Sequence, residues 1–354
     1  MIAILDRHIG RSLLLATLLV TGVLLALFVF ISVVDVLPDY GKGTFGGYEL
    51  LRYVALSQPR KLYEAFPVAV LVGTLLGLST LALNAELTAM RAAGVSKARI
   101  VSAAMKTGLL LMLLAVALGE YVVPAAETQA QTGRARALAT GFQQKGSGLW
   151  LRDGASFVSL GEVLPDLSLL RVAIYEFAPD RRLLRLTSAE RAVYDEGRWR
   201  LEGVQRTRLS EERVEAEAIT EQSWIARLTP EVVAVYTVKP EALSIAQLSA
   251  YIRHLEQNGQ ETGRYRLTMW QKAFMPLATA IMVLLATPFV FQEARSGGLA
   301  QRVFIGVMIG LAFVVLTRSA GYLGVIYGAP PLLGAVLPLA LFLGLAVVLL
   351  RRNA

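Results

Sequence analysis

Residues 12–36 read SLLLATLLVTGVLLALFVFISVVDV, and this apolar stretch carries no charge before Asp35. A helix needs about 20 apolar residues to cross a bilayer core about 30 Å thick. Five further stretches approach or meet that length, at about 63–83, 100–123, 273–291, 303–325 and 331–350. The sequence therefore predicts an α-helical membrane protein with six transmembrane helices, three on each side of a long polar segment.

Composition and charge support a membrane protein. Hydrophobic residues make up 55% of the 354 residues, and the net charge is +8. Residues 127–266 hold 19 basic and 19 acidic side chains, so the whole positive excess lies on the membrane part. This distribution indicates membrane topology and contact with anionic lipids, and no nucleic-acid partner is expected. The chain has no cysteine, which excludes disulfides and thiol nucleophiles.

The cations of the short loops predict the orientation. One side holds Lys42, Arg52, Arg60 and Lys61 in the first loop, with Arg318 near the third. The other side holds nine: Arg7, Arg11, Arg91, Lys97, Arg99, Arg295, Arg302, Arg351 and Arg352. The positive-inside rule then places both termini in the cytoplasm and the polar segment outside, which in a bacterium is the periplasm. We expect three parts: membrane helices in 1–123, a periplasmic domain in 124–266 and membrane helices in 267–354.

The central segment has the pattern of an all-β domain. Alternating runs at 148–152 and 155–160 are joined by Asp153-Gly154, a strong hairpin signal. Further strands are expected at 169–177, 192–194, 198–201, 214–224 and 232–238. Roughly eight strands suit a sandwich or jelly roll. Residues 243–257 then predict an amphipathic helix that leads back to the membrane.

Signatures of enzymes are missing from the chain. No G-x-x-x-x-G-K-[ST] sequence occurs, so no P-loop can hold ATP phosphates. The only histidines, His8 and His254, stand at opposite ends, which argues against a zinc site or a Ser-His dyad. We therefore expect no catalytic residue, no metal ligand and no cofactor on this chain.

The turn between the second and third apolar stretches is one candidate site. Residues 84–96 predict a short helix that Asn84 caps and Gly94 ends. Leu87 and Met90 are three residues apart and share a face. Such a helix can lie in the groove of a cytoplasmic partner and transmit its movement. It can equally be a solvated connection.

A second candidate site is a group of charged residues at the outer membrane interface, where cations can clamp the phosphates of a lipid headgroup. Ordinary interfacial anchoring is the simpler interpretation for most of them. Arg318 is less easily explained in that way, because a guanidinium at membrane depth is costly unless it is paired or faces water. The group consists of Asp35, Lys42, Arg52, Arg60 and Lys61, with Arg318 near the same level.

Two glycine pairs predict close helix packing. Gly73 and Gly77, like Gly306 and Gly310, have the G-x-x-x-G spacing. This spacing lets two helix backbones approach each other. It marks either a dimer face or packing within the chain.

The order and spacing of several short motifs resemble the lipopolysaccharide export permeases, and in particular their G-type subunits. The likeness covers nearly the full length. The motifs are LDRHIG at 5–10, Glu86-Leu87 through Ala93-Gly94, Gly148-Leu149-Trp150 with Asp153-Gly154, ALSI at 242–245, GRY at 263–265 with Trp270 and Lys272, and YGAPP at 327–331.

The resemblance implies a role in an ATP-driven transporter that extracts lipopolysaccharide from the inner membrane and passes it through a periplasmic β-jellyroll. Implied partners are an F-type permease subunit in a heterodimer, a cytoplasmic ATPase homodimer that binds the ATP and magnesium, a periplasmic bridge protein, and in some systems a single-span regulatory subunit.

The resemblance also gives roles to residues. It implies that a helix within 84–96 couples to the ATPase, through Glu86, Leu87, Met90, Arg91 and Gly94. It also implies lipid contacts for Asp35, Arg60, Lys61 and Arg318, and we expect Lys42 to join them. Ser32 departs from similar proteins, which can carry a lysine near this depth.

Two other functions remain open from the residues alone. A membrane scaffold or sensor would use the periplasmic domain to bind a ligand, and the cations would then be structural. An ion-coupled carrier would need carboxylates within the membrane. Asp35 and Glu120 lie only at the ends of the predicted helices.

Overall fold

The computed structural model describes residues 2–139, 149–153, 156–163, 168–178, 182–195, 197–209, 214–224, 226, 228, 240–257, 260–292 and 298–353. The chain forms two compact units. One comprises Met1–Asp35, Ser57–Pro124 and Gly263–Ala354, and the other comprises Val36–Leu56 and Ala125–Thr262. We call them the membrane unit and the β unit.

Six helices are long and apolar enough to cross a membrane, as predicted. The crossings are formed by α1 (Ile2–Val36), α2 (Gly47–Leu83), α4 (Lys97–Ala117) continued by α5 (Val123–Ala139), α8 (Gly263–Gln292), α9 (Leu299–Ile326) and α10 (Pro331–Asn353). A short helix, α3 (Glu86–Ala92), lies between α2 and α4. A π-helical turn, Leu118–Val122, joins α4 to α5. Most helices extend beyond the predicted apolar stretch, because polar residues continue the helix past the hydrocarbon core.

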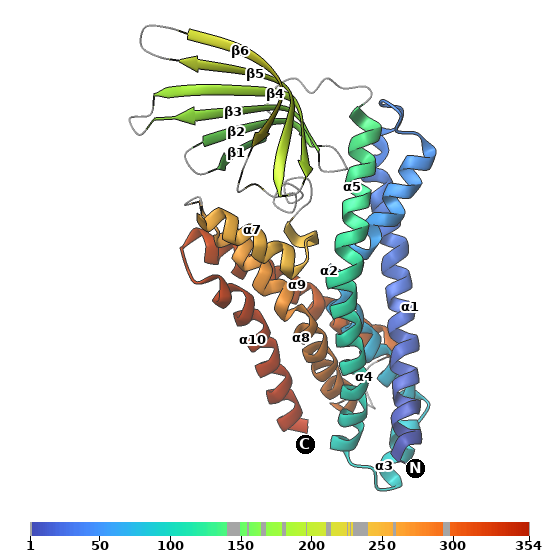
Figure 1. The fold of residues 1–354 in the computed structure, drawn as a ribbon. Coiled ribbons are helices and arrows are strands. Elements are labelled where there is room, and N and C mark those ends of the chain that lie inside the picture. The colour runs from blue at the N-terminus through green and yellow to red at the C-terminus, as the bar shows by residue number, and fades with distance from the viewer. Residues whose placement is uncertain are drawn as a thin grey trace. The chain divides into compact units, whose positions relative to one another are not determined.

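The centre of the membrane unit is α2, whose apolar side chains form the core. Leu71, Leu75 and Leu78 are fully buried and pack in one cluster with side chains of α4 and α8, such as Ile100 and Met282. The N-terminus, α3 and the C-terminal end of α10 lie at the same end of this unit (Figure 1). That arrangement follows from six consecutive crossings.

The glycine pairs serve packing within the chain. A Cβ at Gly73 would lie 2.5 Å from Thr17 Cα, so α1 and α2 touch backbone to backbone. Ser12 Oγ donates to the carbonyl of Gly77 at 3.1 Å in the same contact. A Cβ at Gly306 or Gly310 would meet side chains of α2 at 2.5 Å. Of the two alternatives, a dimer face or packing within the chain, the structure thus shows packing within the chain.

The β unit contains an antiparallel sheet whose strands follow one another in sequence order (Figure 1). Strands 169–177 and 214–224 are confirmed to the residue, whereas the strands around the 195–198 turn are longer than predicted. Trp199 is fully buried, and its Nε1 donates to the carbonyl of Leu228 at 2.6 Å. The strands are β1 (Leu149–Asp153), β2 (Ser156–Val163), β3 (Leu169–Phe177), β4 (Leu183–Asp195), β5 (Arg198–Leu209) and β6 (Val214–Trp224).

The predicted β domain is confirmed, but its described strands form a meander. Among them there is no crossover of the Greek-key kind that defines a jelly roll. The predicted strand at 232–238 and Gly154 of the first hairpin lie outside the described residues. The return helix is confirmed as α7 (Ile245–Gln257), with Leu248, Tyr251 and Leu255 on its buried face. Short 3-10 turns, Leu37–Asp39 and Pro240–Ala242, complete the described elements.

Candidate functional site

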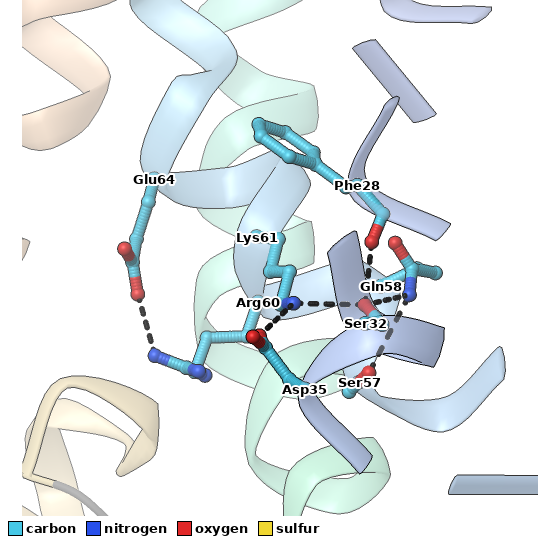
Figure 2. A network of polar contacts seen from close by, with 8 residues as sticks. All are labelled: Phe28, Ser32, Asp35, Ser57, Gln58, Arg60, Lys61 and Glu64. Atoms are coloured by element: carbon cyan, nitrogen blue, oxygen red, sulfur yellow. Dashed lines mark hydrogen bonds and ion pairs between the residues drawn. The ribbon is translucent and has the colours of Figure 1, made fainter. Parts of the chain in front are cut away.

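Four of the five predicted lipid-binding residues lie in the membrane unit near one another. Lys61 of α2 lies 3.9 Å from Asp35 of α1, measured between Nζ and Oδ2. The same Nζ donates to Ser32 Oγ at 2.8 Å (Figure 2). Ser32 is 1% exposed and accepts a second hydrogen bond from Gln58 Nε2 at 3.0 Å. The Ser32 hydroxyl therefore connects α1 to α2 beside the ammonium group of Lys61.

The second part of the site is built around Glu64. Arg60 Nη1 donates to Glu64 Oε1 at 2.8 Å, one helical turn along α2 (Figure 2). Arg318 of α9 reaches the other oxygen of Glu64, with Nη2 and Oε2 3.6 Å apart. Arg60 is 16% exposed and Arg318 is 70% exposed. One carboxylate thus contacts a partly buried and an exposed guanidinium from two different helices.

Helix geometry places this pair near the end of the membrane helices that lies opposite α3. Glu64 lies 19 residues before the end of α2 at Leu83, about 28 Å along the axis at 1.5 Å per residue. Arg318 lies 19 residues after the start of α9 at Leu299, also about 28 Å. Both helix ends return the chain to the side of α3, so both charges stand near the far edge of a hydrocarbon core about 30 Å thick. Arg318 is therefore at membrane depth with an acidic partner.

Lys42 belongs to the β unit, where its Nζ lies 3.0 Å from Asp39 Oδ1. Asp39 also pairs with Arg134 of α5, so this local pair joins the 37–42 turn to α5. A lipid contact of Lys42 stays a prediction.

Sequence reasoning missed the polar residues that connect the cations. Glu64 follows Arg60 by four residues, the spacing at which an acid and a base meet on a helix. That spacing was the available signal. Ser32 and Gln58 had no comparable signal, because their partnership crosses from α1 to α2. Among the described residues, no group of three or more His, Cys, Asp or Glu side chains is placed to hold a metal ion.

The predicted short helix of 84–96 is present as α3. It ends as expected at Gly94, whose φ of +88° favours glycine, and Val95 N donates to the carbonyl of Met90 at 3.0 Å. Its beginning differs from the prediction. Ala85 occupies the N-cap position at φ 59°, with no side-chain cap, so Asn84 is not the capping residue.

The two apolar residues of α3 share a face, and this face points into the chain. Leu87 is 5% exposed within the hydrophobic core, and Met90 packs against the same core. Leu87 therefore anchors the helix and is not available to a docking partner, which corrects that part of the prediction. The exposed side of the turn presents Thr88, Ala89 and Arg91 through Gly94.

The N-terminal motif is tied to this turn by charge. His8 Nε2 lies 2.5 Å from Glu86 Oε2, which connects α1 to the first residue of α3. Asp6 pairs with Arg99 at 2.5 Å and with Lys106 at 2.6 Å, both on α4. Lys106, which interrupts the third apolar stretch, thus has an acidic partner on α1. The ends of α1, α3 and α4 form one polar cluster at the terminal side of the membrane unit.

Comparison with known proteins decides the family. The family model described as "Lipopolysaccharide export system permease LptF/LptG" matches residues 7–352. The chain belongs to the LptF/LptG family of lipopolysaccharide export system permeases. It is 36% identical over 355 residues to the lipopolysaccharide export system permease protein LptG of Escherichia coli strain K12, with 99% of each chain covered. It is 34% identical to the LptG protein of Haemophilus influenzae, covering 100% of this chain and 99% of that one.

Membership of the LptF/LptG family agrees with the fold. The six apolar helices and the family together make the chain a multi-pass inner-membrane protein and a component of a transporter. Two groups of charged side chains in the membrane unit of this LptF/LptG permease carry the candidate sites. One is the Glu86 cluster beside α3, and the other is the cation cluster of Ser32, Asp35, Arg60, Lys61, Glu64 and Arg318.

Proposed function

We propose that this chain is a permease subunit of an ATP-driven transporter that extracts lipopolysaccharide from the inner membrane and passes it by way of the β unit to a periplasmic bridge. The observation that carries the proposal is the family match over residues 7–352. An F-type subunit would complete a heterodimer, and a cytoplasmic ATPase homodimer would bind the ATP and magnesium. A regulatory single-span subunit is compatible with this assembly.

The coupling step would act through α3. Its exposed side, with Arg91 and Gly94, would rest on the ATPase, while Leu87 fixes the helix to the core. Glu86 binds His8 of α1, so a displacement of α3 would reach α1 as well as α2 and α4. We therefore propose that closure of the ATPase dimer moves the helices that carry the cation cluster.

The cation cluster would hold the lipid by its phosphates. Arg60, Lys61 and Arg318 stand near one interface, and Asp35 and Glu64 are acidic partners of these cations. Similar proteins can carry a lysine near the depth of Ser32. Here Ser32 accepts a hydrogen bond from Lys61, which would supply the cation instead. Exposure of acyl chains to water costs about 0.8 kcal/mol per methylene. A sheltered path along the β unit and an input of ATP energy are therefore reasonable requirements.

The proposed topology follows the positive-inside rule. Arg7, Arg11, Arg351 and Arg352 mark the terminal side as cytoplasmic, the side on which α3 also lies (Figure 1). The β unit would then be periplasmic, because three crossings precede it.

A charge reversal at Glu86 tests the proposal. We expect Glu86→Lys, in cells that depend on this copy alone, to reduce both retention of the ATPase in a pull-down and arrival of lipopolysaccharide at the outer membrane. Membrane levels of the variant should stay normal, because an exposed ion pair contributes at most about 1 kcal/mol. Thr80→Lys, also outside the buried core and near the end of α2, is the matched control for an added cation. Undisturbed export and ATPase retention in Glu86→Lys would refute the coupling role and restore the scaffold alternative.

A further inference from the structure

The acid inside the cation cluster has no role in the function proposed above. Glu64 Oε1 accepts from Arg60 at 2.8 Å, and its Oε2 lies 3.6 Å from Arg318 Nη2. A carboxylate in this position lowers the attraction of both cations for any anionic ligand. A site that only had to bind phosphate tightly would be better without it.

We propose that Glu64 is an internal counter-ion that competes with lipid phosphate for Arg60 and Arg318 and so sets how tightly this site holds an anionic headgroup. The inference rests on the proposed function, because it names the residue that tunes the same site. Without ligand, Glu64 compensates two guanidinium groups at membrane depth, where an unpaired guanidinium is costly. With ligand bound, phosphate takes over part of that compensation.

The two arginines are held unequally, which gives the exchange an order. Arg60 is 16% exposed and lies at hydrogen-bond distance from Glu64, whereas Arg318 is 70% exposed and its contact is 3.6 Å. Arg318 is therefore the arginine that leaves Glu64 and binds phosphate first. Its planar guanidinium can bind a phosphate through two parallel hydrogen bonds. Arg60 keeps Glu64 in place, so the acid stays available to recapture Arg318 when the lipid leaves.

The charge of Glu64 explains why the acid matters for transport. Glu64 places one negative charge in contact with both Arg60 and Arg318. A phosphate monoester carries about 1.5 to 2 negative charges at neutral pH. Removal of Glu64 would remove one negative charge that repels this phosphate. The lipid would then bind more tightly and leave more slowly.

The test compares phosphorylated and dephosphorylated lipid on the assembled transporter in nanodiscs. The probes are diphosphoryl lipid A, the same lipid after removal of its phosphates, and inorganic phosphate. We expect Glu64→Gln to bind diphosphoryl lipid A about two- to fivefold more tightly, the range of a partly exposed ion pair. Its affinity should also fall more steeply with salt, while the dephosphorylated lipid should bind as in the wild type. Glu49→Gln, the same substitution in the first turn of α2, should change nothing.

Further variants keep the inference open to refutation if Glu64→Gln does not assemble. The double variant Glu64→Gln with Arg318→Gln should bind diphosphoryl lipid A more tightly than Arg318→Gln alone, because Arg60 is then released from the acid. Glu64→Asp keeps the charge and should bind as the wild type does. An assembled Glu64→Gln with unchanged or weaker affinity, or a double variant no tighter than Arg318→Gln, would overturn the counter-ion role.

The wild type separates the two proposals. If it binds phosphorylated and dephosphorylated lipid equally well, the phosphate site itself fails and the inference fails with it. If it prefers the phosphorylated lipid and Glu64→Gln leaves this preference unchanged, only the counter-ion role fails. A gain in Glu64→Gln for inorganic phosphate but not for the lipid would overturn the assignment to a lipid headgroup.

Discussion

His8 Nε2 and Glu86 Oε2 lie 2.5 Å apart, so the first helix of the chain is bonded to the start of the helix between the second and third membrane crossings. The two residues are 78 positions apart in sequence. Both belong to short motifs of the sequence, LDRHIG at 5–10 and the turn at 86–94. In the proposed coupling step, this contact would pass a movement of α3 to α1 without relying on the core alone.

Loss of this contact should uncouple ATP hydrolysis from export. We expect His8→Ala to lower the amount of lipopolysaccharide exported per ATP hydrolysed in reconstituted vesicles, with ATPase retention unchanged. Stability should change by less than about 1 kcal/mol, because the pair is partly exposed. Arg7→Ala, on the neighbouring exposed residue, is the control. An export-to-hydrolysis ratio equal to that of the wild type would show that the core alone transmits the movement.

Asp6 should be necessary because it compensates Arg99 and Lys106. In Asp6→Asn, the ammonium of Lys106 in the third crossing loses its acidic partner, which is unfavourable near the membrane. We expect a lower melting temperature of the purified protein in detergent. Adding Lys106→Leu to Asp6→Asn should recover part of the loss, because the unpaired charge disappears. A double variant less stable than Asp6→Asn would contradict this explanation.

The approach of α1 to α2 at Gly73 should tolerate no side chain. A Cβ there would lie 2.5 Å from Thr17 Cα, and a backbone atom cannot move aside as a side-chain end can. We expect Gly73→Ala to destabilise the protein by about 1–3 kcal/mol, the usual cost of overpacking. Gly22→Ala in α1 is the matched control, because nothing lies within 4 Å of that position. Thermal unfolding of both variants in detergent measures the difference, and equal melting temperatures would refute the close approach.

Trp199 should be the main anchor of the β unit. It is fully buried, donates to the carbonyl of Leu228 and packs edge-to-face on Tyr194 at 5.1 Å between ring centroids. We expect Trp199→Ala to cost about 3–5 kcal/mol. Trp150→Ala, at an exposed position of β1, should cost much less. Limited proteolysis of the full-length protein would follow the loss, with faster cleavage within 149–224 in Trp199→Ala alone.

The six crossings and the strand pattern follow from the sequence because they depend on local periodicity. An apolar run of about 20 residues, such as 12–36, needs no tertiary information to predict a membrane helix. The strands at 169–177 and 214–224 were likewise predicted to the residue, since alternation of polar and apolar side chains is a property of neighbours in the chain. The strand at 232–238, which lies outside the described residues, stays a prediction.

The arrangement of charges was decided only by tertiary structure. The sequence places Lys42 in one loop with Arg60 and Lys61, and only the structure shows that Lys42 pairs with Asp39 in the β unit. The spacing of Leu87 and Met90 predicted a face for a docking partner, but Leu87 is buried in the hydrophobic core. Spacing defines a face of a helix, and only packing defines what that face meets. The positions of Ser32 between two helices, and of Glu64 between Arg60 and Arg318, arise from contacts between segments far apart in the chain, which no local pattern records.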